Sequence, residues 1–127
     1  MVVAVYGANG YQAKLVLGEL SRHGVKVRLV GRDRQRLHAA AVAVGMNNAE
    51  CRVAAVDNRA ALAAALTGSD VVINCAGPFT ESGAAVVRAA IDARADYVDT
   101  AGEQLYVQSV FDTFSTDAAQ AGVTVVP

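Results

Sequence analysis

Short apolar runs alternate regularly with longer runs of helical period along this sequence. Three of the short runs are almost continuously apolar, which is typical of parallel strands buried on both faces. The longer runs place apolar residues three and four positions apart. We predict five helical segments between six strands, and the strands are expected at residues 2–6, 25–30, 51–56, 70–75, 96–100 and 123–127.

Strands that alternate with helices form a parallel sheet, because the connection between parallel strands is right-handed. The sequence therefore predicts an α/β fold in a single domain, with a doubly wound six-stranded parallel sheet of order 3-2-1-4-5-6. In such a sheet, ligands bind in the crevice at the carboxyl ends of the first and fourth strands. The ends of the helices fit this pattern, since a glycine follows four of the helical runs and N-caps are predicted at Asp33, Asp57 and Ser82.

The composition is that of a globular domain. The chain has 127 residues, of which 54% are hydrophobic and 18% charged. Its formal net charge of −1 provides no basic field for nucleic acid, and no apolar run approaches the roughly 20 residues of a membrane span. Cys51 and Cys75 lie in or beside apolar runs and are predicted to be buried thiols of a cytoplasmic protein. No histidine lies near a cysteine, so the spacing predicts no metal site.

The segment after the first strand has a GxxGxxA pattern and reads Gly7-Ala8-Asn9-Gly10-Tyr11-Gln12-Ala13. In the functional interpretation, Gly7 makes a tight turn and Gly10 lets the backbone approach a pyrophosphate, while the helix N-terminus offers free N–H groups. The alternative is a plain strand-to-helix turn, which uses glycine for conformational reasons alone. A triphosphate-binding P-loop is excluded, because Lys14 is followed by Leu15 instead of a hydroxyl residue.

Arg32 follows the second strand, where an NAD site carries an acidic residue that binds the ribose 2′-hydroxyl. A carboxylate would repel a 2′-phosphate, whereas an arginine binds it through charge-assisted hydrogen bonds. Arg32 therefore predicts NADP(H) as the cofactor. The next residue, Asp33, is an alternative ribose ligand, but its position one residue further on favours a cap of the following helix. Arg34 and Arg36 are predicted to lie on the solvated face of that helix.

Two further strand ends carry suitable side chains. Asp57 and Asn58 follow the third strand, where a side chain can reach an adenine, although both residue types also cap helices well. After the fourth strand, Ala76 and Gly77 leave room for the ribose and nicotinamide side of a cofactor, and Pro78 stiffens the exit. Together, four suitable strand ends predict a dinucleotide site of the Rossmann type.

A resemblance to a known family is carried by the stretches VYGANGYQAKLV, LVGRDRQRL, INCAGPF, YVDTAGE and GVTVVP. The sequence resembles the NADP-binding domain of the saccharopine dehydrogenase-like oxidoreductases. That family includes the trans-acting enoyl reductases of lipid and polyketide assembly. The resemblance covers nearly the whole chain and implies cofactor contacts at Gly7 to Gln12, at Arg32 and around Cys75 to Pro78. It also implies that Asp99 and Glu103 face the cofactor and substrate cleft. The alternative for these two acids is local, with Asp99 capping a turn and Glu103 complementing a helix N-terminus.

Members of this family continue into an α/β substrate and dimerisation domain. We therefore expect residues 1–127 to be the dinucleotide-binding domain of a longer oxidoreductase, with its substrate domain or a homodimer partner outside this chain. Such a chain would bind the nucleotide but would not turn over substrate.

Two functions stay open from the sequence. The first is hydride transfer with NADP(H), acting on an enoyl or acyl type of substrate, and the second is a non-catalytic Rossmann sensor of the NADP/NADPH ratio that acts through a protein partner. A nucleotide-free structural domain is disfavoured by the four strand ends. No general acid or base is assigned, because packing is the expected role of Tyr11, Tyr97 and Tyr106, and no Tyr-x-x-x-Lys pair is present.

Overall fold

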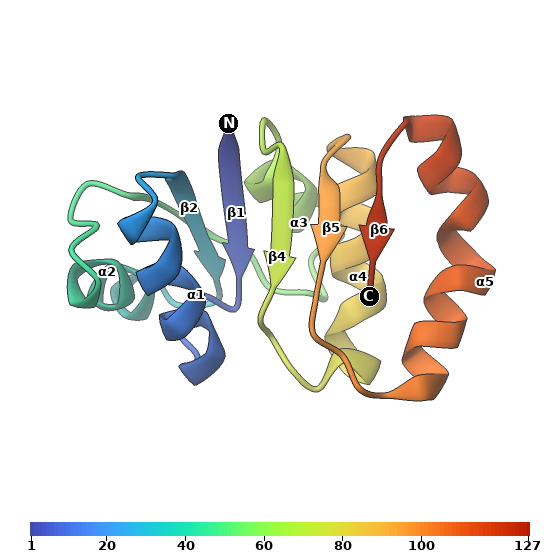
Figure 1. The fold of residues 1–127 in the computed structure, drawn as a ribbon, viewed down its shortest axis with the longest axis horizontal. Coiled ribbons are helices and arrows are strands. Elements are labelled where there is room, and N and C mark those ends of the chain that lie inside the picture. Colours follow the sequence, from blue (N-terminus) through green and yellow to red (C-terminus); the bar gives the residue numbers. More distant parts are fainter.

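A computed structural model, which describes residues 1–127, contains one six-stranded sheet in which every neighbouring pair of strands is parallel (Figure 1). The strand order is β3-β2-β1-β4-β5-β6, which confirms the predicted doubly wound topology. The strands are β1 (Val2–Tyr6), β2 (Lys26–Gly31), β3 (Glu50–Val53), β4 (Val71–Asn74), β5 (Asp96–Val98) and β6 (Val125–Val126).

The last four strands are shorter than predicted. β3 ends at Val53 instead of residue 56, β5 at Val98 instead of residue 100, and β6 has only two residues. The apolar residues beyond these ends pack under loops: Val56 and Val123, for example, contact the core without belonging to a strand. Apolar character alone therefore overestimated the length of the paired segments.

Five helices cover the sheet on two faces: α1 (Tyr11–Arg22), α2 (Arg34–Ala43), α3 (Arg59–Leu66), α4 (Phe79–Asp92) and α5 (Gln104–Ala121). One buried cluster joins α1 and α2 to β1 and β2, and it includes Leu17, Leu37, Val5 and Leu29. A larger cluster joins α3, α4 and α5 to the opposite face. The sheet thus separates two apolar cores.

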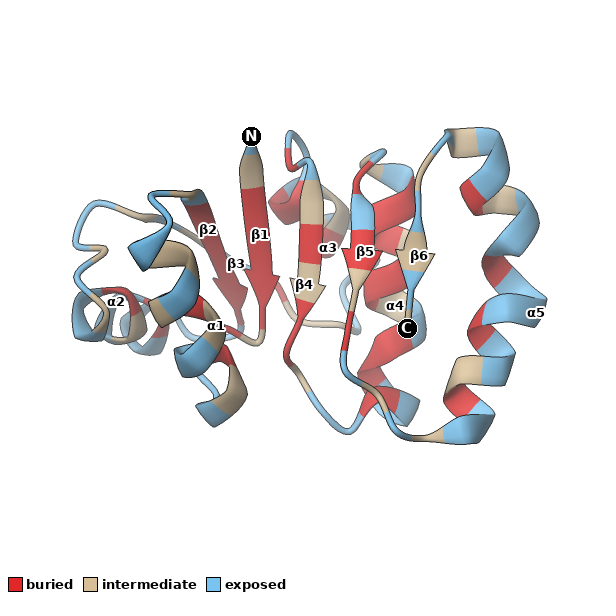
Figure 2. Ribbon diagram, in the orientation of Figure 1, coloured by how far each residue is buried: buried red, intermediate tan, exposed pale blue.

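The central strand β1 shows why both faces need a cover. Val3 and Val5 point into the α1–α2 core, while Ala4 and Tyr6 point into the α3–α5 core. All four residues are at most 4% exposed (Figure 2). Burial of each valine side chain contributes about 1.5–3 kcal/mol, so β1 fixes the middle of the fold and the position of the loop that follows it.

The helix ends confirm some of the predicted caps and correct others. The carboxylate of Asp33 accepts a hydrogen bond from the Arg36 N–H at 3.1 Å, as predicted for the N-cap of α2. The N-cap of α3 is Asn58, which accepts from the Ala61 N–H at 3.0 Å, and not Asp57. Ser82 lies inside α4 instead of capping it, because the chain enters that helix at Phe79 and the Ser82 hydroxyl bonds backward to the Ala76 carbonyl.

Both cysteines are free thiols, but only Cys75 is buried as predicted, and burial raises its pKa to about 11. Cys51 is partly exposed, because β3 lies at the edge of the sheet and lacks a neighbour on one side. No helix of this chain is both long and apolar enough to span a membrane.

We predict that Asp33→Ala lowers the free energy of unfolding by about 0.5–2 kcal/mol, because it removes the acceptor for the first turn of α2. Chemical denaturation of the nucleotide-free protein measures this loss. Asp33→Asn keeps an acceptor oxygen at the same place and should retain most of the stability. An equal loss in both variants would contradict a capping role.

Candidate functional site

The turn after β1 is built around Gly7, which has a left-handed φ of +72°. Its N–H donates to the Val30 carbonyl at 2.9 Å, and its own carbonyl accepts from the Gly10 N–H at 3.1 Å. A Cβ added to Gly7 would lie only 2.8 Å from the Cβ of Ala76, which follows β4. Both the conformation and the approach to Ala76 therefore require glycine at this position.

Gly10 precedes α1 and faces open space. An added Cβ would meet only the Gly7 carbonyl, at 3.5 Å. The helix that starts at Tyr11 has neither a side-chain cap nor an acidic residue in its first turn, so the N–H groups of Tyr11 and Gln12 have no acceptor within the chain. Open backbone, free N–H groups and the positive end of a helix dipole are the features that a phosphate group requires.

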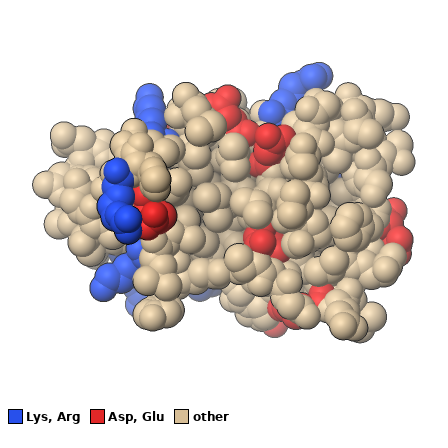
Figure 3. All heavy atoms as spheres, viewed as in Figure 1, with Lys and Arg blue, Asp and Glu red and all other residues tan.

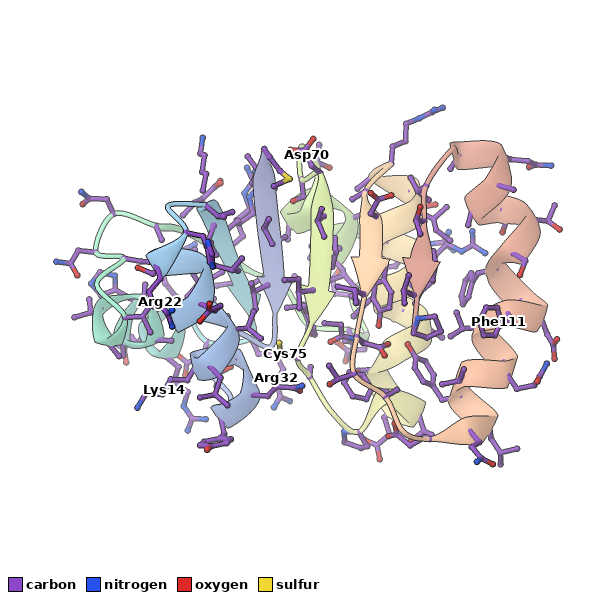
Figure 4. The ribbon with its side chains drawn as sticks, viewed as in Figure 1. Lys14, Arg22, Arg32, Asp70, Cys75 and Phe111 are labelled. Atoms are coloured by element: carbon purple, nitrogen blue, oxygen red, sulfur yellow. The ribbon has the colours of Figure 1, made fainter.

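Arg32 and Asp57 are exposed and lie at the carboxyl edge of the sheet. Burial raises the pKa of the Tyr6 hydroxyl, and among the smaller effects Arg32 lowers that pKa while Asp57 raises it. Both charges therefore lie near enough to the end of β1 to act on the Tyr6 hydroxyl. In Figure 4, Arg32 and Cys75 both lie at this edge of the sheet, and Arg22 lies higher, toward the other end of α1. Asn58 was predicted to belong to the same site, but its side-chain oxygen is already bonded to the Ala61 N–H at the start of α3.

The segment after β4 is held at its ends and open in its middle. The Ala76 N–H donates to the Asn74 Oδ1 at 3.0 Å, and the Ala76 carbonyl accepts from the Ser82 hydroxyl. Gly77 and Pro78 are exposed, and a Cβ added to Gly77 would meet nothing within 4 Å. This segment therefore presents a small, fixed and accessible surface next to the glycine loop.

A cavity of about 460 Å³ lies between α1 and α2, and four of the predicted loop residues line it, namely Ala8, Asn9, Gly10 and Tyr11. Lys14 and Arg36 add two positive charges to its wall. Lys14 was not predicted as a site residue, and Arg36 was predicted only on a solvated face, although it lies four residues beyond Arg32. Figure 3 shows that the basic side chains on this face are scattered, and that one group of them lies against acidic side chains.

The remaining predicted residues lie outside this cavity. Gly7, Arg32 and the segment from Cys75 to Pro78 do not line it. Gln12 points the other way, toward the loop after β5, where its amide donates to the Thr100 hydroxyl. The predicted residues therefore form two groups, one on the α1–α2 side and one on the β4 side, that meet where Gly7 contacts Ala76.

The two acids after β5 have local partners. Asp99 is buried and accepts hydrogen bonds from the hydroxyls of Tyr97 and Tyr106, each at 2.6 Å, and from the Ala101 N–H at 2.9 Å. Glu103 accepts from the Phe79 N–H at 3.1 Å, at the start of α4. These contacts match the local alternative for both acids.

The expected packing role holds for Tyr97 and Tyr106, which are buried, but it is wrong for Tyr11. The side chain of Tyr11 is 82% exposed, because the first turn of α1 projects beyond the sheet edge.

The topology and the glycine loop define this chain as a nucleotide-binding domain of the Rossmann type. Residues 3–126 match the family model of the saccharopine dehydrogenase NADP binding domain, and the chain belongs to that family. Membership identifies the cofactor as NADP(H), as Arg32 predicts.

Among curated proteins, the chain is similar to the trans-acting enoyl reductases of Mycobacterium tuberculosis and Mycobacterium ulcerans, each 29% identical over 128 residues. The matches cover 98% of this chain but only 31% of each relative, so the chain spans less than a third of their length. Among solved structures, apo saccharopine dehydrogenase (L-Glu forming) from Saccharomyces cerevisiae has a TM-score of 0.79 at 23% identity, over 98% of this chain and 26% of that one. The similarity to the yeast enzyme, at this low identity, shows that the two chains share a fold.

We predict that Gly7→Ala destabilises the protein more than Gly24→Ala does. Both glycines have left-handed φ angles, of +72° and +63°, so each alanine carries a similar backbone strain of roughly 1–2 kcal/mol. Only the alanine at Gly7 also collides with Ala76, since the space around Gly24 is empty. Thermal unfolding of the two variants measures the difference, and equal losses would contradict the close approach of β1 and β4.

Proposed function

We propose that this chain is the cofactor-binding part of an NADP(H)-dependent oxidoreductase that transfers a hydride to or from an enoyl or acyl type of substrate. The observation that carries the proposal is the glycine loop, which ends at an uncapped helix N-terminus beside the β4 end. That arrangement leaves room and hydrogen-bond donors for a pyrophosphate at the crevice.

In this proposal the cofactor lies across the two groups of residues. The loop from Gly7 to Gln12 binds the pyrophosphate, and Arg32 binds the 2′-phosphate. Lys14 and Arg36 strengthen the positive field at the same end, and Asp57 lies on the adenine side. The segment from Cys75 to Pro78 accommodates the ribose and nicotinamide side.

The bound nicotinamide supplies the hydride chemistry, and the residues of this chain orient it and exclude water. Among the candidate general acids and bases, Tyr97, Tyr106 and Asp99 are buried in mutual hydrogen bonds. The exposed Tyr11 lines the α1–α2 cavity and not the segment after β4. We therefore assign substrate binding and proton transfer to parts of the protein beyond this chain.

The names of the relatives support the choice of an oxidoreductase over a sensor, because they are a reductase and a dehydrogenase. The term enoyl reductase also supports an enoyl substrate for the whole protein. We place this activity in the cytoplasm, where the two free thiols would stay reduced.

We predict that Arg32→Ala weakens NADPH binding by about 1.5–3 kcal/mol, the contribution of a hydrogen bond to a charged group, and hardly changes NADH binding. Calorimetric titration with both nucleotides measures the two losses. Arg22→Ala is the matched control, because Arg22 is the last residue of α1 and lies at the end of that helix away from the glycine loop, and it should change neither. Equal losses for NADPH and NADH in the Arg32 variant would contradict the 2′-phosphate assignment.

We also predict that Gly10→Val abolishes nucleotide binding and preserves the fold, because the valine side chain would fill the open space in front of the loop. Circular dichroism checks the fold, and an NADPH titration checks binding. Gly18→Val, which also has empty space around it, places the same side chain further along α1 and should leave affinity unchanged. Retained affinity in the Gly10 variant would mean that the loop is only a turn.

A further inference from the structure

A buried polar network lies under the β4 side of the crevice, within an otherwise apolar core. Asp99 is the only acidic residue that is buried, at 6% exposure, and its three neighbours Asn74, Tyr97 and Tyr106 are at most 4% exposed. A buried carboxylate is costly unless its hydrogen bonds are satisfied, and here every buried polar side-chain atom has a partner. The network contains no group that the pyrophosphate loop requires, so its role needs a separate explanation.

The chemistry of Asp99 sets the direction of each hydrogen bond. The hydroxyls of Tyr97 and Tyr106 both donate to its Oδ2. The Tyr97 oxygen is then free to accept, and it does so from the Nδ2 of Asn74 at 3.1 Å. The orientation of the Asn74 amide is thereby fixed, and its Oδ1 faces the Ala76 N–H at 3.0 Å.

The network therefore extends from Asp99 to the backbone of Ala76. The carbonyl of the same residue accepts from the Ser82 hydroxyl, so both polar backbone groups of Ala76 are held. Ala76 is also the residue against which Gly7 packs. A shift of Ala76 would change the distance between the glycine loop and the β4 segment.

The far end of the β4 segment is held by α5. The Phe79 N–H donates to Glu103, and the Phe79 ring stacks on Tyr106 with centroids 6.0 Å apart. The Tyr106 ring occupies the space that a side chain at Gly83 would need, since an added Cβ would lie 2.2 Å from the ring. Ala76 and Phe79 are both fixed, and the exposed Gly77 and Pro78 lie between them.

We propose that Tyr97, oriented by Asp99, is a positioning residue that acts through Asn74 to hold the Ala76–Pro78 segment in place for the nicotinamide half of NADP(H). This inference rests on the proposed function, because it requires the cofactor to lie across the crevice. The 2′-phosphate and adenine are bound on the β2 side, at Arg32 and Asp57, which the network does not reach. The network should therefore affect one half of the cofactor only.

The test is Tyr97→Phe, which removes the hydroxyl that links Asp99 to Asn74 and keeps the ring. NADPH, which spans both halves of the site, and 2′,5′-ADP, which occupies only the adenine half, are titrated into the variant and the wild type. We expect the Kd of NADPH to rise about fivefold or more, the worth of one hydrogen bond, and the Kd of 2′,5′-ADP to stay within about twofold. The fluorescence of the bound nicotinamide should also change.

Tyr6→Phe is the matched control, because it removes another buried hydroxyl, one that donates to the Ala54 carbonyl at 3.4 Å outside the network. It should show no loss specific to NADPH. Asp99→Asn, which introduces a donor where the network needs an acceptor, replaces Tyr97→Phe if that variant does not fold and should give the same selective loss.

Equal losses for the two ligands, no loss in either, or failure of both variants to fold would overturn the inference and leave the network a structural element. Wild-type protein that binds neither ligand would instead contradict the proposed function on which the inference rests.

Discussion

The site depends on the close approach of two backbone segments at the carboxyl ends of β1 and β4. These strands are neighbours because the chain crosses from one side of the sheet to the other after β3. Gly7 then meets Ala76 with no space for a Cβ between them, and the left-handed φ of Gly7 directs the chain into α1. Larger residues at either position would push the glycine loop away from the β4 segment and widen the crevice.

The two sides of the contact between Gly7 and Ala76 differ in charge and in the interactions that fix their backbone. On the α1–α2 side, an uncapped helix N-terminus, Lys14 and Arg36 surround an open cavity. On the β4 side, a chain of hydrogen bonds runs from Asp99 through Tyr97 and Asn74 to the Ala76 N–H. This chain holds the backbone of the segment after β4 in place. A dinucleotide has the same asymmetry, since its phosphates need positive charge and its nicotinamide ring needs a fixed orientation.

Features encoded locally or by periodicity were predictable from the sequence. The doubly wound parallel sheet followed from alternation and handedness, and its strand order followed from the Rossmann class of sheet. The Asp33 cap followed from its position before a helical run. Features that depend on distant partners were not predictable. The bond between Asn74 and Tyr97 joins residues 23 positions apart, and the burial of Arg28 in β2 depends on Glu50 and on Thr67 beyond α3. The Asp57 and Ser82 caps failed because a sequence pattern does not fix the first residue of a helix.

Calorimetric titration of the unmodified protein with NADPH and, separately, with NADH tests whether the glycine loop and Arg32 bind the cofactor together. A loop that binds pyrophosphate next to an arginine that binds the 2′-phosphate predicts one molecule of NADPH per chain, held at least about tenfold more tightly than NADH. Equal affinities for the two nucleotides, or binding of neither, would contradict this account of the site.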